Sequence, residues 1–167
     1  CIEAGYLLDE MDLEVIGDGI HVPKELLRLI YKIKGRDHMV LCTDSMRGAG
    51  MPEGGTSILG SLSKGQAVLL EDGVAKMPDR SCFAGSIATA DRLIRTLHVQ
   101  AGIPLCDAVD MLTSNPARIM GIGDRKGSLK PGYDADIVLL DKDLYARGTF
   151  VEGRRIYGCR KPVNRIV

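Results

Sequence analysis

Apolar residues along the first forty positions follow strand spacing and helix spacing in turn. Residues 13–17, Leu-Glu-Val-Ile-Gly, predict a short strand, and residues 24–34 place leucines and isoleucines at helical spacing. Pro23 suits the first turn of that helix and Gly35 suits its end. Residues 39–42, Met-Val-Leu-Cys, form a continuous apolar run that is typical of a strand buried on both faces in a parallel sheet. Strand, helix and strand in this order predict a βαβ unit.

Two later regions are predicted to be β-structure alone. Residues 67–75 read as a hairpin around an Asp-Gly turn. Beyond Gly127 the pattern predicts a strand at 137–140 and a second hairpin, whose strands at 149–151 and 155–157 flank a Glu-Gly turn. The chain is therefore expected to be α/β first and all-β at its end.

Three further helices are expected between these β-regions. Residues 81–86 are predicted to lead into the first, with Ser86 as its N-cap. The second is expected to begin at Pro104. Asn115 is predicted to cap the third, with Pro116 at its first helical position.

Composition excludes several classes of protein. The chain has 167 residues, 45% of them apolar, with 22 basic and 22 acidic side chains. This apolar fraction is too high for whole-chain disorder, and a net charge of zero argues against nucleic acid or an anionic membrane as partner. No stretch approaches the ~18 apolar residues of a membrane helix.

The cysteines bear on the cellular compartment, and the first residue bears on whether the chain is part of a longer protein. Cysteines stand at 1, 42, 82, 106 and 159 without a C-x-x-C pair, so reduced thiols and a cytoplasmic location are expected rather than a disulfide framework. The chain begins with a cysteine, and the residues after it resemble the interior of a folded protein. We therefore expect the C-terminal part of a longer protein.

Asp44 is the sharpest candidate for a catalytic residue. It follows directly after the predicted strand 39–42. In barrels of parallel strands, the carboxyl edge of the sheet carries the catalytic groups. A carboxylate there can take a proton from water and return it to a leaving group. The alternative is a helix N-cap, because Asp is favoured there, and position alone does not decide between the two.

His21 lies in the loop after the preceding predicted strand. It could hydrogen-bond a substrate or ligate a metal, although a lone loop histidine is more often satisfied by the backbone. Two consecutive strands that each deliver a polar side chain to one edge favour the functional interpretation. His38 and His98 are expected to be structural, and no H-x-H or H-E-x-x-H spacing predicts a zinc site.

Two glycine-containing segments invite a phosphate-binding interpretation. Residues 48–50 fail the dinucleotide fingerprint, because Glu53 stands where it needs glycine, and a mobile loop near a site is expected instead. Residues 84–86, Ala-Gly-Ser, are predicted to lie at a helix start. Free N–H groups there could bind an anion or a sugar hydroxyl, and ordinary capping is the equal alternative.

Five motifs occur in an order that resembles one enzyme family. They are Asp-Gly-Ile-His-Val at 18–22, Thr-Asp at 43–44, Phe-Ala-Gly-Ser at 83–86, Asn-Pro-Ala-Arg at 115–118 and Gly-Ser-Leu-Lys-Pro-Gly-Tyr-Asp-Ala-Asp-Ile-Val at 127–138. In this order they resemble the C-terminal half of the N-acetylglucosamine-6-phosphate deacetylases of the amidohydrolase superfamily. The first and third motifs are the more specific ones, and the resemblance covers essentially the whole chain.

The resemblance implies a fold in two parts. Family members combine a (β/α)8 TIM-like barrel with a small β-sandwich. Residues 1–126 would be the C-terminal part of the barrel, with a β-hairpin insertion near 56–80. Residues 127–167 would supply strands of the sandwich.

The resemblance also implies the chemistry. The reaction would be metal-dependent hydrolysis of the acetamide of N-acetylglucosamine 6-phosphate. Asp44 would activate a metal-bound water and then protonate the departing amine. His21 would contact the sugar phosphate, and Phe83, Ala84 and Gly85 would line the substrate pocket through their backbone.

The implied cofactor is a divalent metal, zinc or iron, held in the full-length protein by a Glu and two His that this chain lacks. The isolated chain is therefore expected to hold no metal alone and to be inactive. The resemblance further suggests a homodimer acting on a small amino-sugar phosphate. Two other functions stay open: a superfamily relative acting on another amide or a cyclic imide, and a non-catalytic binding or assembly fragment.

Overall fold

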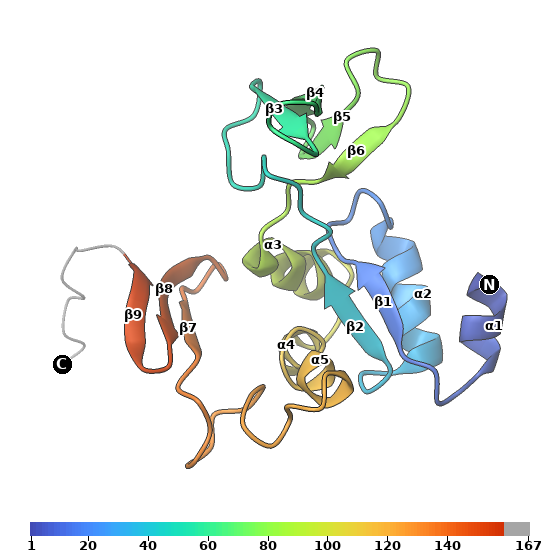
Figure 1. The fold of residues 1–167 in the computed structure, drawn as a ribbon. Helices are drawn as coiled ribbons and strands as arrows, with labels where there is room; N and C mark the ends of the chain where they lie inside the picture. Colours follow the sequence, from blue (N-terminus) through green and yellow to red (C-terminus); the bar gives the residue numbers. More distant parts are fainter. Residues whose placement is uncertain (159–167) are drawn as a thin grey trace.

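The computed structural model describes residues 1–158 as a mixed α/β protein with three β-sheets (Figure 1). In chain order, the elements are α1 (Ile2–Leu7), β1 (Leu13–Ile16), α2 (Lys24–Lys34), β2 (Met39–Cys42), β3 (Thr56–Leu59), β4 (Gln66–Glu71), β5 (Val74–Lys76), β6 (Phe83–Ser86), α3 (Ala90–Arg95), the π-helical turn η1 (Thr96–Gln100), α4 (Leu105–Asp110), α5 (Ser114–Ile119), β7 (Ile137–Leu140), β8 (Ala146–Val151) and β9 (Arg154–Gly158). Residues 159–167 lie outside the described residues, and with them Cys159 and the end of the segment predicted at 127–167.

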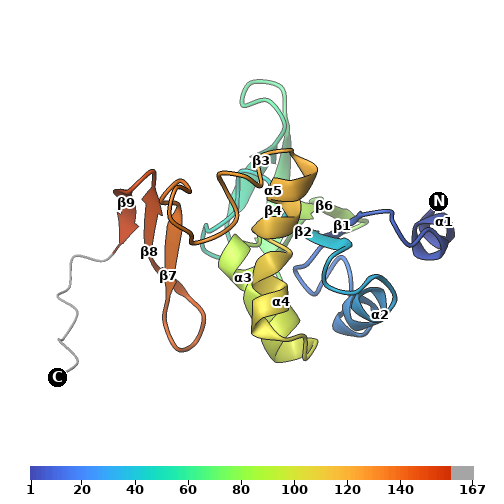
Figure 2. The ribbon, with the colours of Figure 1, turned by 90° about the horizontal axis from the view of Figure 1, so that it is seen from below.

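A parallel pair of strands, β1 and β2, forms the centre of the α/β body. The pair begins with Leu13 opposite Met39. Met39, Val40 and Leu41 are buried, because α2 covers one side of the pair while α4 and α5 lie on the other (Figures 1 and 2). The helix between the two strands ends at Gly35, whose φ of 65° suits glycine. The predicted βαβ unit is therefore confirmed.

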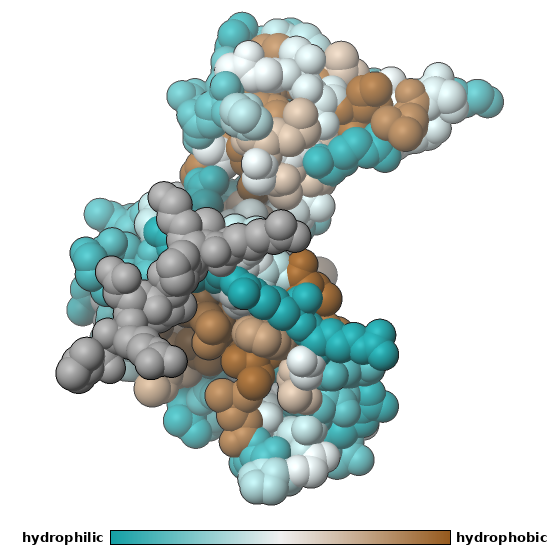
Figure 3. Space-filling model, turned by 90° about the vertical axis from the view of Figure 1, so that its left-hand side faces the viewer, coloured by the Kyte–Doolittle hydropathy of each residue, from teal (hydrophilic) through white to brown (hydrophobic). Residues whose placement is uncertain are grey.

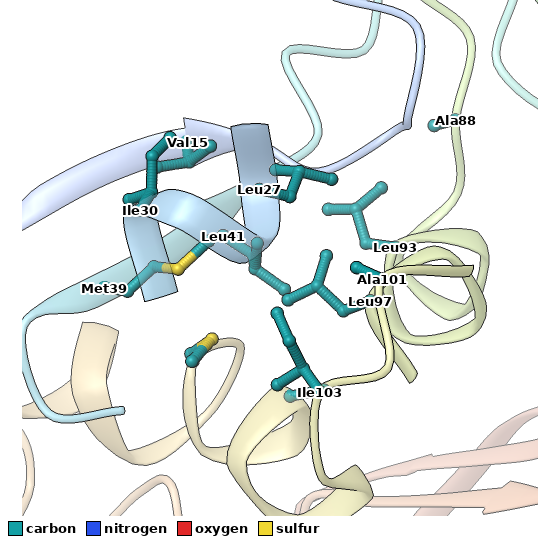
Figure 4. Packing of buried hydrophobic residues seen from close by; sticks show 12 residues of the cluster. Val15, Leu27, Ile30, Met39, Leu41, Ala88, Leu93, Leu97, Ala101 and Ile103 are labelled. Atoms are coloured by element: carbon teal, nitrogen blue, oxygen red, sulfur yellow. The ribbon is translucent and has the colours of Figure 1, made fainter. Parts of the chain in front are cut away.

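One apolar core joins the β1–β2 pair to the helices (Figure 4). Its buried members are Val15, Leu27, Ile30, Met39, Leu41, Ala88, Leu93, Leu97, Ala101, Ile103, Ala108 and Met111. Leu93 and Leu97 point from α3 and η1 toward the strand pair (Figure 4). A Cβ added at Gly17 would lie 2.9 Å from Leu41 Cδ2 and 3.2 Å from Leu97 Cδ1. The core therefore reaches to the carboxyl end of β1 and leaves no space there.

Residues 56–86 contain a four-stranded antiparallel sheet in the order β3-β4-β5-β6. The predicted turn between β4 and β5 is confirmed. Asp72 and Gly73 have φ values of 53° and 73°, as a type I′ turn requires at both central residues. This sheet is larger than the hairpin expected near 56–80, because β3 and β6 extend it on either side. An apolar cluster of its own stabilises this sheet.

The prediction that residues 81–86 lead into a helix capped by Ser86 is wrong. Residues 83–86 pair with β5 as strand β6, and α3 begins only at Ala90, after Thr89. The hydroxyl of Ser86 accepts a hydrogen bond from Ala88 N at 3.0 Å, inside the connection between strand and helix. Serine is a residue type favoured at helix N-caps. Residues 83–86 pair instead with the free edge of β5, and the local spacing of residues in the sequence does not reveal this partner.

Asn115 is not an N-cap either. It lies inside α5, which begins at Ser114. Its buried side-chain amide donates hydrogen bonds to Arg36 O at 2.5 Å and Met39 O at 2.9 Å. Asn115 therefore ties α5 to the start of β2, a long-range role that sequence spacing could not predict.

The last sheet, β7-β8-β9, confirms the predicted strand and hairpin at the end of the chain. It lies against the body through α3 (Figures 1 and 2). Arg95 donates to Leu144 O at 2.9 Å and its guanidinium lies 3.9 Å from the ring centroid of Tyr145. Asp91 accepts a hydrogen bond from Ala146 N at 3.2 Å. These contacts join the β-region to the α/β body.

Apolar residues are exposed on the side that carries this last sheet. Val138, Leu139, Ile156 and Tyr157 are each more than half exposed. Figure 3 shows apolar residues in the lower half of this side and a hollow between the four-stranded sheet and the body below it. None of the helices in residues 1–158 combines the length and apolarity that a membrane crossing requires.

Candidate functional site

The carboxyl ends of β1 and β2 lie on one edge of the body, because the two strands are parallel. Both strands point toward the four-stranded sheet (Figure 1). The loop from Asp18 to His21 follows β1, and Thr43 and Asp44 follow β2. The structure therefore delivers the polar residues of both loops to one edge, as the sequence predicted.

Asp18 holds His21 in a defined orientation. One carboxylate oxygen, Oδ1, accepts hydrogen bonds from the backbone N–H groups of Ile20 and His21, both at 2.9 Å. The other, Oδ2, lies 2.7 Å from Nδ1 of the His21 ring. The Asp18 side chain is fully buried, whereas His21 keeps 17% of its side chain exposed. With Nδ1 bound to Asp18, Nε2 is the ring nitrogen left for a ligand.

Burial of the Asp18 carboxyl raises its pKa, but its hydrogen bonds outweigh that effect. The bonds from Ile20 N, the His21 ring and His21 N all favour the charged form, so the pKa of Asp18 is lowered below its usual value. Asp18 therefore stays a carboxylate and stabilises the loop that carries His21.

We expect Asp18→Asn to lower the free energy of unfolding by about 1.5 kcal/mol near neutral pH, because a charge-assisted hydrogen bond to His21 is lost. A lowered folded-state pKa contributes stability that is present above the unfolded-state pKa and is lost as pH falls through the folded-state value. The difference between parent and variant should therefore shrink as pH falls below about 4. Urea unfolding of both proteins across pH checks this, and a difference that grows in acid contradicts it.

Asp44 stands exposed directly after β2. Its φ of 46° places it in the left-handed region, which Asp and Asn adopt more readily than most residues. Its side chain makes no hydrogen bond or ion pair with residues 1–158, and the residues that follow it are not helical. The alternative interpretation of Asp44 as a helix N-cap is therefore wrong, and its carboxylate is available to a ligand.

Strand β6 lies beside both loops. Phe83 is 47% exposed, and its ring meets the edge of the His21 ring with centroids 5.1 Å apart. At the other end of the strand, Ser86 N donates to Asp44 O at 3.2 Å. The two candidate loops thus contact opposite ends of β6. The N–H of Ser86 is occupied by this bond, and residues 84–86 lie in a strand, so the expected helix start at these residues is wrong.

Gly85 sits where β6 passes Asp44. Its φ of 96° favours glycine, and a Cβ there would lie 3.4 Å from Met46 Cβ and 3.8 Å from Asp44 O. Ala84, beside it, is buried. The structure therefore brings Phe83, Ala84 and Gly85 next to the loops of His21 and Asp44, on a strand rather than at a helix.

Cys42 lies at the end of β2 beneath this edge. Burial raises the pKa of its thiol, and the nearby carboxylates of Glu14 and Asp44 raise it further. Both effects disfavour the thiolate form of Cys42.

The remaining histidines bind structural partners. His38 Nδ1 lies 3.2 Å from Asp12 Oδ1, and His98 Nδ1 lies 2.9 Å from Ile103 O. Across residues 1–158, no three His, Cys, Asp or Glu side chains are grouped so that they could hold a metal ion.

Sequence analysis missed two residues that shape this edge. Asp18 was part of a motif but carried no role, although an acidic residue three positions before a histidine in a tight loop is a usable signal. Arg92 lies in none of the sequence motifs. It donates from α3 to Gly73 O at 2.8 Å and to Asp18 O at 3.4 Å. Its partners are 19 and 74 positions away, so no local pattern predicts them.

Comparison with known sequences gives consistent results over nearly the whole described chain. The profile of the Amidohydrolase family matches residues 3–158. The chain is 34% identical over 143 residues to N-acetylglucosamine-6-phosphate deacetylase of Caenorhabditis elegans, a match that covers 86% of this chain and 33% of that protein. It is 32% identical over 142 residues to a putative N-acetylgalactosamine-6-phosphate deacetylase of Escherichia coli K12, covering 85% of this chain and 81% of that protein.

Solved structures agree with these matches. The crystal structure of N-acetylglucosamine-6-phosphate deacetylase from Thermotoga maritima aligns with a TM-score of 0.80 and 33% identity, over 93% of this chain and 41% of that one. The mixed α/β architecture is therefore shared with a solved deacetylase. The chain spans about a third of the length of the Caenorhabditis elegans relative.

Proposed function

The chain belongs to the amidohydrolase family, and on that premise we propose that the protein hydrolyses the acetamide of N-acetylglucosamine 6-phosphate to glucosamine 6-phosphate and acetate. The observation that carries this proposal is the position of Asp44. Its carboxylate has no partner among residues 1–158, follows a buried parallel strand and lies next to β6, whose other end contacts His21. The names of the relatives support the choice of substrate class.

Asp44 would act first as general base and then as general acid. Its carboxylate takes a proton from water as the water oxygen bonds to the acetamide carbonyl carbon. It then returns that proton to the amide nitrogen as the C–N bond breaks, which releases acetate and the free amine. The exposed side chain and the absence of a competing partner in residues 1–158 support this role.

His21, Phe83, Ala84 and Gly85 would bind the substrate. Nε2 of His21 is the free ring nitrogen and can donate to a phosphate oxygen when the ring is protonated. Phe83 limits the movement of that ring by its edge contact. Because Gly85 has no side chain, a sugar can approach the backbone of β6 closely.

A divalent metal fits the family, but the described residues do not assemble a site for it. When bound, such a metal lowers the pKa of its water and polarises the carbonyl. We expect its ligands, and the choice between zinc and iron, to depend on residues other than 1–158. The roles of Asp44 and His21 above require no further assumption about that site.

We further propose that residues 1–126 are the C-terminal part of a (β/α)8 barrel and residues 127–167 belong to a β-sandwich. The parallel β1–β2 pair with helices on both sides supports the first part. The antiparallel β7-β8-β9 sheet supports the second.

A second candidate substrate is N-acetylgalactosamine 6-phosphate. The Escherichia coli relative of that putative activity is 32% identical and is covered over 81% of its length. The two sugars differ in the orientation of one hydroxyl, and the described residues include no contact that selects between them. Parallel assays with both sugars decide this point.

The phosphorylated sugar should be hydrolysed with a kcat/KM roughly tenfold or more above that of N-acetylglucosamine, because a charge-assisted bond to the phosphate is worth about 1.5–3 kcal/mol. Acetate release from the metal-loaded full-length protein that contains this chain, assayed with both sugars, measures this ratio. An N-acetyl amino acid and a cyclic imide serve as controls. Preference for either control would favour a relative with another substrate, and no hydrolysis of any of them would favour a non-catalytic fragment.

A further inference from the structure

Arg92 connects two parts of the candidate site that are far apart in sequence. Its guanidinium extends from α3, donating through Nη1 to Gly73 O at 2.8 Å and, by a longer bond, through Nη2 to Asp18 O at 3.4 Å. Gly73 is in the β4–β5 turn, and Asp18 begins the loop that carries His21. A planar guanidinium can bridge two carbonyls in this way, whereas an ammonium group provides only a point charge.

No carboxylate of residues 1–158 pairs with Arg92. The side chain is nevertheless half-buried and directed at two backbone carbonyls. This distinguishes it from Arg95 on the same helix, which pairs with Asp91 at 2.8 Å. Its contacts therefore place the turn and the loop relative to each other rather than neutralise a charge.

The turn is packed tightly against this guanidinium. A Cβ added at Gly73 would lie 2.8 Å from Nη2 and 3.1 Å from Nη1 of Arg92, and 3.2 Å from Cδ1 of Ile20. Ile20 belongs to the same loop as His21. The turn thus lies close to both the guanidinium and the loop and leaves no space for a side chain at Gly73.

These contacts form a closed network that includes the proposed substrate-binding residues His21 and Phe83. His21 contacts Asp18, and Arg92 bonds to both Asp18 and Gly73. Gly73 leads into strand β5, which pairs with β6, and Phe83 of β6 contacts the imidazole of His21. Asp44 adjoins this network through Ser86, which donates to Asp44 O and lies opposite Val74 in β5, but Asp44 itself directly follows strand β2.

We propose that Arg92 is a positioning residue that fixes the β4–β5 turn against the Asp18–His21 loop, and so sets the spacing of His21 and Phe83 for an anionic sugar substrate. The substrate in this proposal rests on the function proposed above. The contact of Arg92 with the turn and the loop does not depend on that function. Loss of Arg92 should weaken substrate binding more than chemistry, since Asp44 directly follows β2, which is held by its pairing with β1 and by the apolar core.

Hydrogen exchange tests the contact without any substrate. In purified Arg92→Ala, we expect backbone amides in residues 17–22 and 70–76 to exchange about tenfold faster than in the parent, as the loss of one charge-assisted bond implies. Arg28→Ala is the matched control, because Arg28 is an exposed helical arginine without a hydrogen bond or ion pair to the described residues. Arg92→Lys should give an intermediate rate, and it replaces the alanine variant if that one does not fold.

Kinetics with the phosphorylated sugar tests the consequence. We expect Arg92→Ala to raise KM about tenfold while kcat changes less than about threefold, with partial recovery in Arg92→Lys. Unchanged exchange in either segment overturns the proposal, and so does a fall in kcat with KM unchanged. If the metal-loaded full-length protein hydrolyses none of the sugars, the proposed function fails, while the exchange measurement still decides whether Arg92 holds the turn and the loop together.

Discussion

Replacing Asp44 by asparagine should lower kcat about a thousandfold, the middle of the range for loss of a positioned general base. Asparagine keeps the shape of the side chain and tolerates the left-handed backbone at φ 46°. Its amide, however, can neither take a proton from water nor return one to the amine. Acetate release from the full-length parent and variant proteins under identical metal loading measures the effect.

Two controls make this result specific to the carboxylate. Glu53→Gln removes an exposed acidic group from the loop after Asp44 and should leave kcat unchanged. Unfolding by urea should give nearly equal stability for Asp44→Asn and the parent, because the carboxylate has no partner in residues 1–158. Activity of Asp44→Asn within tenfold of the parent would remove Asp44 from the mechanism.

Leu97→Ala should lower the free energy of unfolding by about 3 kcal/mol, within the range measured for leucine truncations in packed cores. Leu97 is fully buried between the strand pair and the helices (Figure 4). Its Cδ1 also lies against Gly17, one residue before Asp18. The cavity left by the truncation would therefore weaken both the core and the support of the His21 loop.

Val99→Ala provides the comparison from the same helical turn. Val99 is 70% exposed, so its truncation removes little packing and should cost less than about 0.5 kcal/mol. Urea unfolding with matched slopes for the parent and both variants measures the two effects. A loss of less than about 1 kcal/mol for Leu97→Ala would show that the core relaxes around the missing atoms.

The first forty residues show how far sequence alone could go. Helix spacing at 24–34, its stop at Gly35 and the apolar run at 39–42 predicted a βαβ unit, and each is confirmed. These features are local or depend on burial pattern, which the sequence records directly. Helix α1 was not predicted, because its six residues carry no clear apolar face.

The segment around Ser86 shows where sequence reasoning failed. A serine before an apolar stripe looks the same whether it caps a helix or ends a strand. The unpaired edge of β5 decided for the strand, and that edge is formed by residues seven to twelve positions earlier in the chain. Asn115 repeats the lesson, because its amide is used by Arg36 O and Met39 O rather than by its own helix.

The sequence by itself determined the βαβ unit, the two hairpin turns and the order in which polar residues follow buried strands, since all of these depend on neighbours within a few positions. The tertiary structure alone decided that β6 would join the loops of His21 and Asp44, and that Arg92 would bridge Gly73 and Asp18. Such contacts arise from the folded path of the chain between distant residues, and no periodicity or capping signal encodes that path.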